Sequence, residues 1–511
     1  MSQPTVQVHG KRGFFMRFLD VVERVGNRLP HPFMIFIYLA VIMIALSWLA
    51  SSLGAQVVHP GSGEEVTVQN MVSKEGLTFI LSSMLKNFSG FQPLGLVLVM
   101  MLGMGLADKV GLIETFMRRV ILNAPARLVT FAVVFAGVMG NLASDAAFVI
   151  VPPLAATVFY HLGRHPLAGL AAGFAGVGAG FTANLIPAGT DALMAGITTP
   201  IAQTITPGLE VSIVDNYYFM AFSVLVLSLV GTWVTERLVE PKLGVYEGEI
   251  QQALEEISPQ EIRGLRRSGI AFLFYAAVIA LITIPANGWL NSAPGEPFHK
   301  SPFFQGIVPL ILFAVVIMAI TYGVTVGRIK GSRDIPHLMG EAMKDMAGFI
   351  VLIFAAAQFI AYFKYSNLDI WLAVKGADLL TALNLTGMST IIGFIILTAF
   401  LNLFIFSGSA QWALMAPVFV PMFMILNYDP AFIQLAYRIG DSSTNVITPL
   451  NPYLPIILIA MRQYSKNAGF GTLMSTMLPY SIFFLISWTV LMVAWVLLGI
   501  PIGPGIGMLM R

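Results

Sequence analysis

Uncharged apolar segments of about 20 residues recur along almost the whole chain. Each is long enough to cross about 30 Å of hydrocarbon as an α-helix. Only 11% of the 511 residues are charged, and the mean hydropathy is +0.81, which a fully water-exposed surface does not tolerate. The sequence therefore predicts an all-α polytopic membrane protein, with a single transmembrane domain over residues 33–511.

Several function classes are disfavoured by what the chain lacks. A net charge of +2 provides no basic stripe for nucleic acid. Cysteine is absent, which excludes disulfides, Cys-based metal sites and thiol catalysis. The phosphate loop of ATP-driven pumps is also missing, as is a His-Glu-x-x-His zinc motif. We expect no enzyme and no cofactor other than a coupling ion, with an intramembrane enzyme as the alternative from a different class.

Residues 1–32 are predicted to form a cytoplasmic segment before the first span. Between Arg12 and Leu29, phenylalanine and valine alternate with arginine and glutamate, which is typical of an amphipathic helix lying at the lipid surface. A solvated basic tail is the alternative. The apolar run that follows, Phe33–Ala55, lacks a cleavage site and is too long for a signal-peptide core, so we expect it to remain as a span.

The distribution of lysine and arginine predicts which loops face the cytoplasm. The N-terminus and the charged loop 236–268, which we expect to contain a solvated helix, lie inside, whereas residues 57–76, residues 364–385 and the C-terminus lie outside. The nine predicted crossings are Phe33–Ala55, Pro93–Ala107, Leu167–Ala195, Tyr217–Val234, Ile270–Pro285, Ile307–Val326, Met346–Phe363, Ala431–Ala460 and Pro479–Leu498.

A first hairpin unit is predicted over residues 127–195. The apolar stretch 128–162 has basic residues at both ends and a polar centre from Asn141 to Asp145. Because both ends belong on the cytoplasmic side, we interpret it as a re-entrant hairpin whose tip stops near the midplane, where protein or water surrounds it. The crossing that follows is interrupted around Asn184 and Pro187, which indicates a discontinuous helix.

A second unit, residues 386–461, repeats this pattern. Its polar tip runs from Asn402 to Gln411, and its crossing is interrupted between Arg438 and Pro449. The spacing from Ser144 to Pro152 equals that from Ser409 to Pro417. An odd number of crossings separates the hairpins, so the units are inverted relative to each other. Inverted repeats with paired broken helices are typical of secondary transporters, with the site at the repeat interface.

Charged residues predicted near the bilayer centre are the leading site candidates, because burying a charge there costs about 2.5–3.5 kcal/mol on insertion scales. Arg438 and Asp441, three residues apart, could simply neutralise each other. Alternatively, the carboxylates and exposed carbonyls at the breaks bind a cation or a substrate carboxylate. Trp412 could stack on an aromatic ligand or only pack. The charged candidates are Asp145, Asp191, Arg438 and Asp441, with neutral polar groups at Asn141, Ser144, Asn184, Ser407, Ser409, Thr444 and Asn445.

Several motifs spread over nearly the whole chain resemble the p-aminobenzoyl-glutamate transporter (AbgT) family. They include Val22–Phe33, Lys86–Phe91, Ser144–Ala147, Gly163–Pro166, Gly180–Asn184, Met346–Ile350, Ser407–Ser409 and Leu498–Pro504. The resemblance implies a homodimer in the bacterial inner membrane, each protomer with nine spans and two re-entrant hairpins.

The resemblance also implies a function: gradient-driven transport of p-aminobenzoyl-glutamate, a folate breakdown product, or export of sulfonamide antimetabolites driven by protons or Na⁺. Arg438 suits the carboxylates or sulfonamide, Trp412 the aminobenzoyl ring, and Asp191 and Asp441 the coupling ion or proton. Asp145, Asn141, Asn184 and Asn445 join the coupling group, with a possible Na⁺ site at Asn141, Asn184, Asp441 and Asn445. The positions matching the family's functional motif are Asp191, Asn402, Ser409, Trp412, Pro430, Arg438, Asp441 and Pro449, the prolines holding bends.

Overall fold

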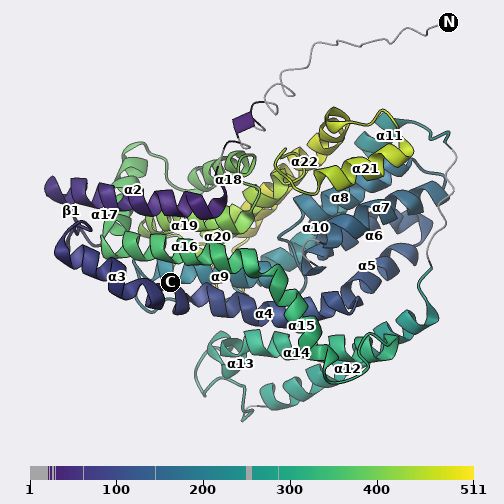
Figure 1. The fold of residues 1–511 in the computed structure, drawn as a ribbon, viewed down its shortest axis with the longest axis horizontal. Helices are drawn as coiled ribbons and strands as arrows, with labels where there is room; N and C mark the ends of the chain where they lie inside the picture. The colour runs from purple at the N-terminus through teal and green to yellow at the C-terminus, as the bar shows by residue number, and fades with distance from the viewer. Residues whose placement is uncertain are drawn as a thin grey trace, which may run out of the picture.

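A computed structural model describes residues 30–60, 62–143, 146–248, 256–285 and 287–510, together with a few positions between 21 and 28 (Figure 1). The predicted amphipathic helix between Arg12 and Leu29 lies almost entirely outside the described residues, as does Asp145. Within the described chain the architecture is helical, apart from a short antiparallel pair, β1 (Gln56–Val58) and β2 (Glu65–Thr67).

Eight helical segments of the described chain are long and apolar enough to cross a membrane, or nine if one bent pair counts as a span. Seven of the eight correspond to predicted continuous crossings, and the eighth, Gly408–Ile425, is a limb of the second hairpin. The two predicted broken crossings are present as pairs of shorter helices, and the fold-class prediction is confirmed. The continuous crossings are α2 (Pro32–Ser52), α4 (Gln92–Lys109), α10 (Tyr217–Val234), α12 (Pro259–Thr283), α14 (Ile307–Val326), α16 (Ala347–Tyr365) and α22 (Phe470–Leu497).

Several helices occupy segments where loops were expected. α3 (Lys74–Ser89) runs up to α4, α15 (Asp334–Asp345) precedes α16, and α17 (Leu368–Ala382) fills most of the segment expected outside. The amphipathic α5 (Leu112–Leu122) buries one apolar face and meets the first hairpin at 115°. These helices were missed because they are short or carry charges, so a search for uncharged spans passes over them.

The loop 236–268 also differs from its prediction. α10 continues through a π-helical turn (Thr235–Val239) into the short α11 (Glu240–Leu243). The helix expected in the solvated loop is instead the first part of α12, which begins at Pro259, eleven residues before the predicted span. Ser258 caps it, since its hydroxyl accepts from the Glu261 amide while the Glu261 carboxylate accepts from the Ser258 amide.

The first hairpin consists of α6 (Val129–Met139) and α7 (Ala146–His161), and both limbs pack on α8 (Pro166–Ala179). The chain breaks after α8 and resumes in α9 (Gly189–Ala202). The second unit has the same order: limbs α18 (Met388–Asn402) and α19 (Gly408–Ile425) pack on α20 (Pro430–Thr444), and α21 (Leu454–Tyr464) follows the break. In both hairpins the second limb contains two prolines, 152 and 153 in α7 and 417 and 421 in α19.

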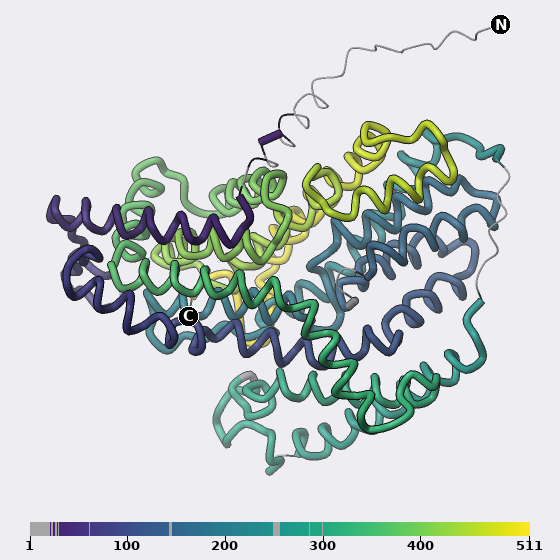
Figure 2. Tube along the Cα trace, in the orientation of Figure 1, coloured from purple at the N-terminus to yellow at the C-terminus, as the bar shows by residue number. Residues whose placement is uncertain are grey.

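The two units exchange their final half-helices. α9, from the first unit, packs on α19 of the second, whereas α21, from the second unit, packs on α7 and α8 of the first. Figure 2 shows the consequence along the chain trace, where the segments following each break lie against the other unit. The broken ends of α8 and α20 therefore meet in the interior of the protein, and the site is built there.

Candidate transport site

Arg438 on α20 is fully buried and forms an ion pair with Asp191 on α9. Its Nη2 lies 2.8 Å from Asp191 Oδ1 and donates to the Thr182 carbonyl oxygen at 2.6 Å, while Nη1 donates to Asn216 Oδ1 at 3.5 Å. Within the described chain this is the only ion pair that Arg438 makes, so its partner is not Asp441, its near neighbour in sequence. The pair joins the two repeat units across their interface.

Asp191 has its remaining acceptor capacity satisfied locally. Its Oδ2 accepts from the Asn184 side-chain amide and from the Ala188 backbone amide, each at 2.7 Å. Asp191 also lies in the first turn of α9, where the partial positive charge of a helix N-terminus stabilises a carboxylate. A guanidinium, two amides and a helix N-terminus therefore surround the Asp191 carboxylate.

Asp441 is equally buried but has no ion-pair partner among the described residues. Its Oδ1 lies 3.1 Å from the Tyr437 hydroxyl, and that hydroxyl also lies 2.6 Å from the Gly408 carbonyl oxygen. The carboxylate packs directly against Gly408 at the start of α19, where an added Cβ would lie only 2.9 Å from Asp441 Oδ2. Because tyrosine has one hydroxyl hydrogen, it can donate to only one of these two acceptors at a time.

An asparagine at each hairpin tip is attached to the break of its own unit. Asn141 donates to the carbonyl oxygens of Phe181 and Ala183 at 2.8 and 3.2 Å. Asn402 donates to the Asp441 carbonyl oxygen at 2.7 Å and to Asn445 Oδ1 at 2.9 Å. In both residues the other side-chain atom, Oδ1, is buried without a hydrogen-bond partner in the described chain. A buried unpaired acceptor is costly, so both sites call for an additional donor or a cation.

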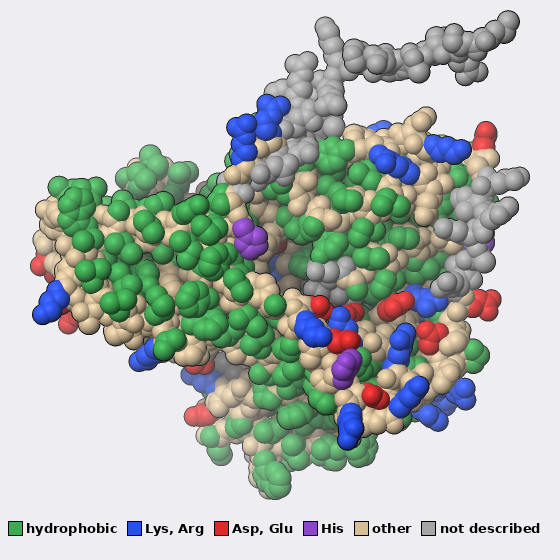
Figure 3. Space-filling view, in the orientation of Figure 1, with side chains coloured by type: hydrophobic (Ala, Val, Ile, Leu, Met, Phe, Trp, Pro, Cys, Tyr) green, Lys and Arg blue, Asp and Glu red, His purple; other side chains and the backbone are tan. Residues whose placement is uncertain are grey.

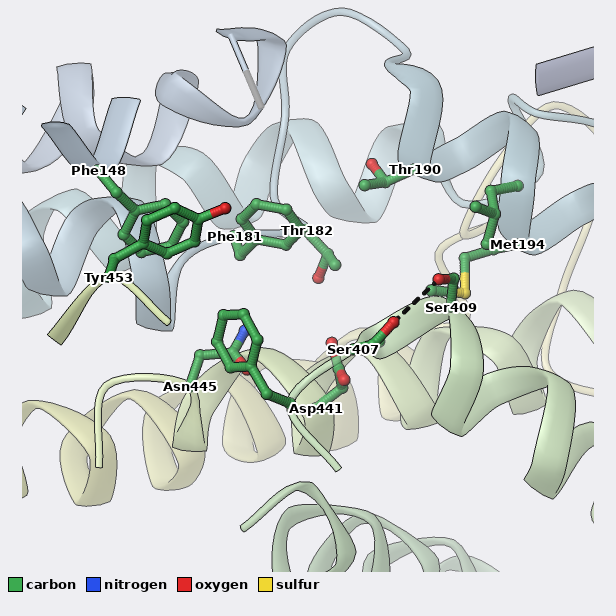
Figure 4. Close-up of a pocket in the computed structure, with 13 residues that line it drawn as sticks. Phe148, Phe181, Thr182, Thr190, Met194, Ser407, Ser409, Asp441, Asn445 and Tyr453 are labelled. Carbon is green, nitrogen blue, oxygen red and sulfur yellow. Dashed lines mark hydrogen bonds between the residues drawn. The ribbon is translucent and has the colours of Figure 1, made fainter. Parts of the chain in front are cut away.

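A central pocket of about 260 Å³ lies where the units meet (Figure 4). Asp441, Ser409 and Asn445 supply polar groups to its wall. Another part of the wall is aromatic: Tyr453 stacks on Phe148 with ring centroids 4.4 Å apart. In Figure 4 these stacked rings lie at one end of the pocket, and Asp441 lies apart from them, near Ser407. The aromatic lining, Phe148, Phe181, Phe406 and Tyr453, was missed from sequence because apolar residues of this kind fill every membrane helix.

The other sequence-predicted residues occupy varied positions. Trp412 is fully buried, donates to Thr198 Oγ1 at 3.0 Å and packs against Tyr437 with ring centroids 4.6 Å apart, so here it packs rather than lining the pocket. Pro430 is the first residue of α20, and Pro449 lies in the turn before α21, consistent with holding bends. Asn445 also donates to the Gly178 carbonyl oxygen at 3.3 Å. Within the described residues no group of three His, Asp or Glu side chains forms a metal cluster.

The two inverted hairpin units, their exchanged half-helices and the buried polar centre define a multi-pass helical membrane transporter rather than an enzyme. Similarity to known proteins identifies the particular family. A model of the AbgT putative transporter family matches residues 17–510, and the chain belongs to this family.

Relatives resemble the chain over nearly its whole length. The p-aminobenzoyl-glutamate transport protein of Escherichia coli K12 is 44% identical over 485 residues, covering 95% of this chain and 96% of that protein. The Neisseria gonorrhoeae MtrF structure, described as illuminating a class of antimetabolite efflux pumps, matches with a TM-score of 0.91 at 44% identity, covering 96% of this chain and 100% of that one. The Alcanivorax borkumensis YdaH transporter structure matches with a TM-score of 0.88 at 37% identity, covering 93% and 100%.

Proposed function

We propose that this protein is an ion-gradient-coupled secondary transporter that moves p-aminobenzoyl-glutamate across the bacterial inner membrane. Family membership and the similarity to the E. coli p-aminobenzoyl-glutamate transport protein support this substrate. The structural observation that carries the mechanism is the unequal pairing of the two buried carboxylates. Asp191 is paired with Arg438, whereas Asp441 lines the pocket and forms no ion pair with a basic side chain of the described residues.

Asp441 is the group that we propose to exchange the coupling ion. No basic side chain of the described residues is paired with it, so a proton or a cation can balance its charge. A protonated Asp441 would donate to Tyr437, which frees the tyrosine hydrogen for the Gly408 carbonyl oxygen. Ion binding would thus change the contact between α20 and the N-terminal turn of α19.

The hairpin tips provide the sites that a Na⁺ ion would use instead. The unpartnered Oδ1 atoms of Asn141 and Asn402 are hard oxygen ligands of the kind that such cations prefer. Asn445 and Asp441 lie beside Asn402, and Asn184 lies on the break that Asn141 contacts. We propose one ion position at each tip, at equivalent places in the inverted units.

Cargo recognition is proposed to use Ser409 and the aromatic wall of the central pocket. Arg438 could bind a cargo carboxylate only if its pair with Asp191 opened, because a guanidinium donates along a planar fork that Asp191 and Thr182 now occupy. Asn402 and Trp412 do not line the pocket, so we propose that they act indirectly, by positioning the residues that do.

Export of sulfonamide antimetabolites is the second candidate function. It is favoured by the similarity to MtrF, whose description refers to antimetabolite efflux pumps. The two functions require the same fold and differ in the cargo and in the direction of net transport. Proteoliposomes with an imposed Na⁺ or proton gradient of either sign distinguish them: uptake of labelled p-aminobenzoyl-glutamate supports import, and extrusion of a sulfonamide supports efflux. Gradient-independent leakage of both would contradict coupled transport.

We further propose that the N-terminus is cytoplasmic, that the C-terminus is periplasmic and that two copies form a dimer. The natural absence of cysteine makes sidedness directly measurable. Single cysteines replacing Leu128 and Arg164, at the two ends of the first hairpin, should both react with an impermeant thiol reagent only from the cytoplasmic side. Labelling from opposite sides would contradict the re-entrant interpretation.

A further inference from the structure

A second cavity of about 550 Å³ lies beside the central pocket, and we call it the vestibule. Its wall includes Val97, Met101 and Met104 of α4, Asn141 at the first hairpin tip, Thr190 of α9 and Phe349 of α16. Thr190 and Leu193 line both cavities, so the N-terminal turns of α9 separate them. The vestibule adjoins the first break and Asn141, but its walls from α4 and α16 were not among the sites predicted from the sequence.

The two cavities differ in size and lining. Sites for drug-sized molecules usually have volumes of about 300–1,000 Å³ and apolar walls with a few convergent polar groups. The central pocket, at about 260 Å³, falls below this range, whereas the vestibule, at about 550 Å³, lies within it. Methionine is flexible and makes favourable sulfur–aromatic contacts, so a cavity lined by Met101, Met104 and Phe349 suits a flat aromatic group.

Thr190 supplies a free polar group at the boundary. Its hydroxyl is buried and makes no hydrogen bond among the described residues. In Figure 4 this hydroxyl points away from Ser407 and Asp441, out of the central pocket. Because a buried hydroxyl without a partner costs free energy, its position favours a ligand atom that can donate or accept a hydrogen bond there.

We propose that the vestibule is a second cargo-binding site, which takes the aromatic amine portion of the transported molecule and holds it against Phe349 and the α4 methionines, with Thr190 as its hydrogen-bond partner. The inference rests on the proposed function for the identity of the cargo. Cargo in this position lies next to Asn141, so that it would adjoin the ion position proposed at the first hairpin tip.

The charged rim of the vestibule is consistent with an entrance. Lys109 Nζ and Asp345 Oδ2 form an ion pair at 2.8 Å, and the two side chains are 29% and 63% exposed. An ion pair with this exposure contributes about 0–1 kcal/mol to stability, so it can open at little cost. Figure 3 shows charged side chains gathered over α5, α12 and α15, in contrast to the hydrophobic surface over α2 and α16.

Equilibrium binding of labelled p-aminobenzoyl-glutamate and of a sulfonamide to the purified full-length protein tests the proposal. Met101→Trp fills the vestibule and should weaken binding at least tenfold. Phe349→Ala removes the aromatic wall and should weaken it about threefold to tenfold. Phe313→Ala, which removes a ring that is 56% exposed on α14, is the matched control and should leave binding unchanged within twofold.

A labelling experiment covers the case in which Met101→Trp does not fold. A single Thr190→Cys should react with a small maleimide, and saturating cargo should slow the reaction at least fivefold. The vestibule proposal is overturned if three results occur together: the wild-type protein binds cargo, Phe349→Ala binds it equally well, and cargo does not slow labelling of Thr190→Cys. If Ser409→Ala weakens binding and the vestibule variants do not, the proposed function stands without a vestibule site. If the wild-type protein binds neither probe, the proposed function and this inference both fail.

Discussion

The two hairpin units share an architecture, but the buried carboxylates that they contribute have different partners. Asp191 of the first unit is fixed by Arg438, two amides and a helix N-terminus, whereas Asp441 of the second faces the pocket with a tyrosine as its only side-chain partner in the described chain. A carboxylate that is already paired has little reason to change state. The difference leads us to propose that Asp191 mainly holds the two units together, whereas Asp441 exchanges the coupling ion or proton.

The bases of the hairpins differ as well. At the first base Arg164 bonds the Glu240 carboxylate and Thr130, and its guanidinium lies 4.2 Å from the centre of the Phe159 ring. Burial lowers the pKa of the adjacent His165, against the opposing effect of Glu240.

The second base is tied by backbone hydrogen bonds instead. The Asp429 amide donates to the Met508 carbonyl oxygen, and the Met510 amide donates to the Asn427 carbonyl oxygen. The C-terminal residues thus hold the turn of the second hairpin. One base depends on charge, and the other depends on main-chain geometry.

The largest expected effect is on the pair that joins the units. Arg438→Ala leaves Asp191 buried without its cation, and breaking a buried pair in this way costs about 3–5 kcal/mol. We expect a large fall in the unfolding temperature of the detergent-purified protein. Replacing both residues with leucine should lower the unfolding temperature less than Arg438→Ala alone does. The exposed Arg328→Ala serves as the control, and wild-type stability of Arg438→Ala would contradict a structural pair.

The second effect concerns coupling. Asp441→Asn keeps the shape of the side chain but can neither bind a proton nor carry a charge, so gradient-driven flux should fall at least 100-fold, with the folded protein retained. The exposed Asp378→Asn on α17 should transport normally. Undiminished flux in correctly inserted Asp441→Asn would remove the proposed distinction between the two carboxylates. Asp191→Asn, in contrast, should lower stability as well as flux.

A smaller effect is expected where Asp441 meets the second hairpin. Gly408→Ala places a methyl group about 3 Å from both carboxylate oxygens, and such overpacking typically costs about 1–3 kcal/mol. Flux should fall because Asp441 is displaced. Gly393→Ala on α18 of the same hairpin is the matched control, because its added Cβ has no neighbouring atom within 4 Å. Equal behaviour of the two variants would show that the contact at Gly408 is unimportant.

The smallest effect is expected at the first hairpin base. Arg164 and Glu240 are 21% and 23% exposed, so solvent screens part of their attraction, and Arg164→Ala should lower the free energy of unfolding by about 1 kcal/mol. Raising the salt concentration should lower the free energy of unfolding slightly for the wild-type protein and less for the variant. Substitution of the exposed Arg127, Arg127→Ala, at the other end of the same hairpin, should show no change. A loss as large as that of Arg438→Ala would mean that both ion pairs are equally structural.

Much of the fold was predictable because membrane insertion is governed by local properties of the chain. The length of the apolar segments predicted where the chain crosses the membrane, and the polar residues around Asn141 and Asn402 predicted the tips of both hairpins. The broken helices followed from Pro187 and Pro449 within apolar runs. Helices that are short or carry charges, such as α15 and α17, do not meet this criterion and were therefore not predicted.

The sequence by itself determined that this chain spans a membrane, that it contains two inverted units, and which rare polar residues the membrane interior would have to accommodate. The tertiary structure decided how those residues combine. Arg438 lies three residues from Asp441, yet it pairs with Asp191, about 250 residues away, because the half-helix α9 crosses to the other unit. Burial makes an ion pair depend on distances of a few ångströms, and those distances are set by packing between segments remote in sequence.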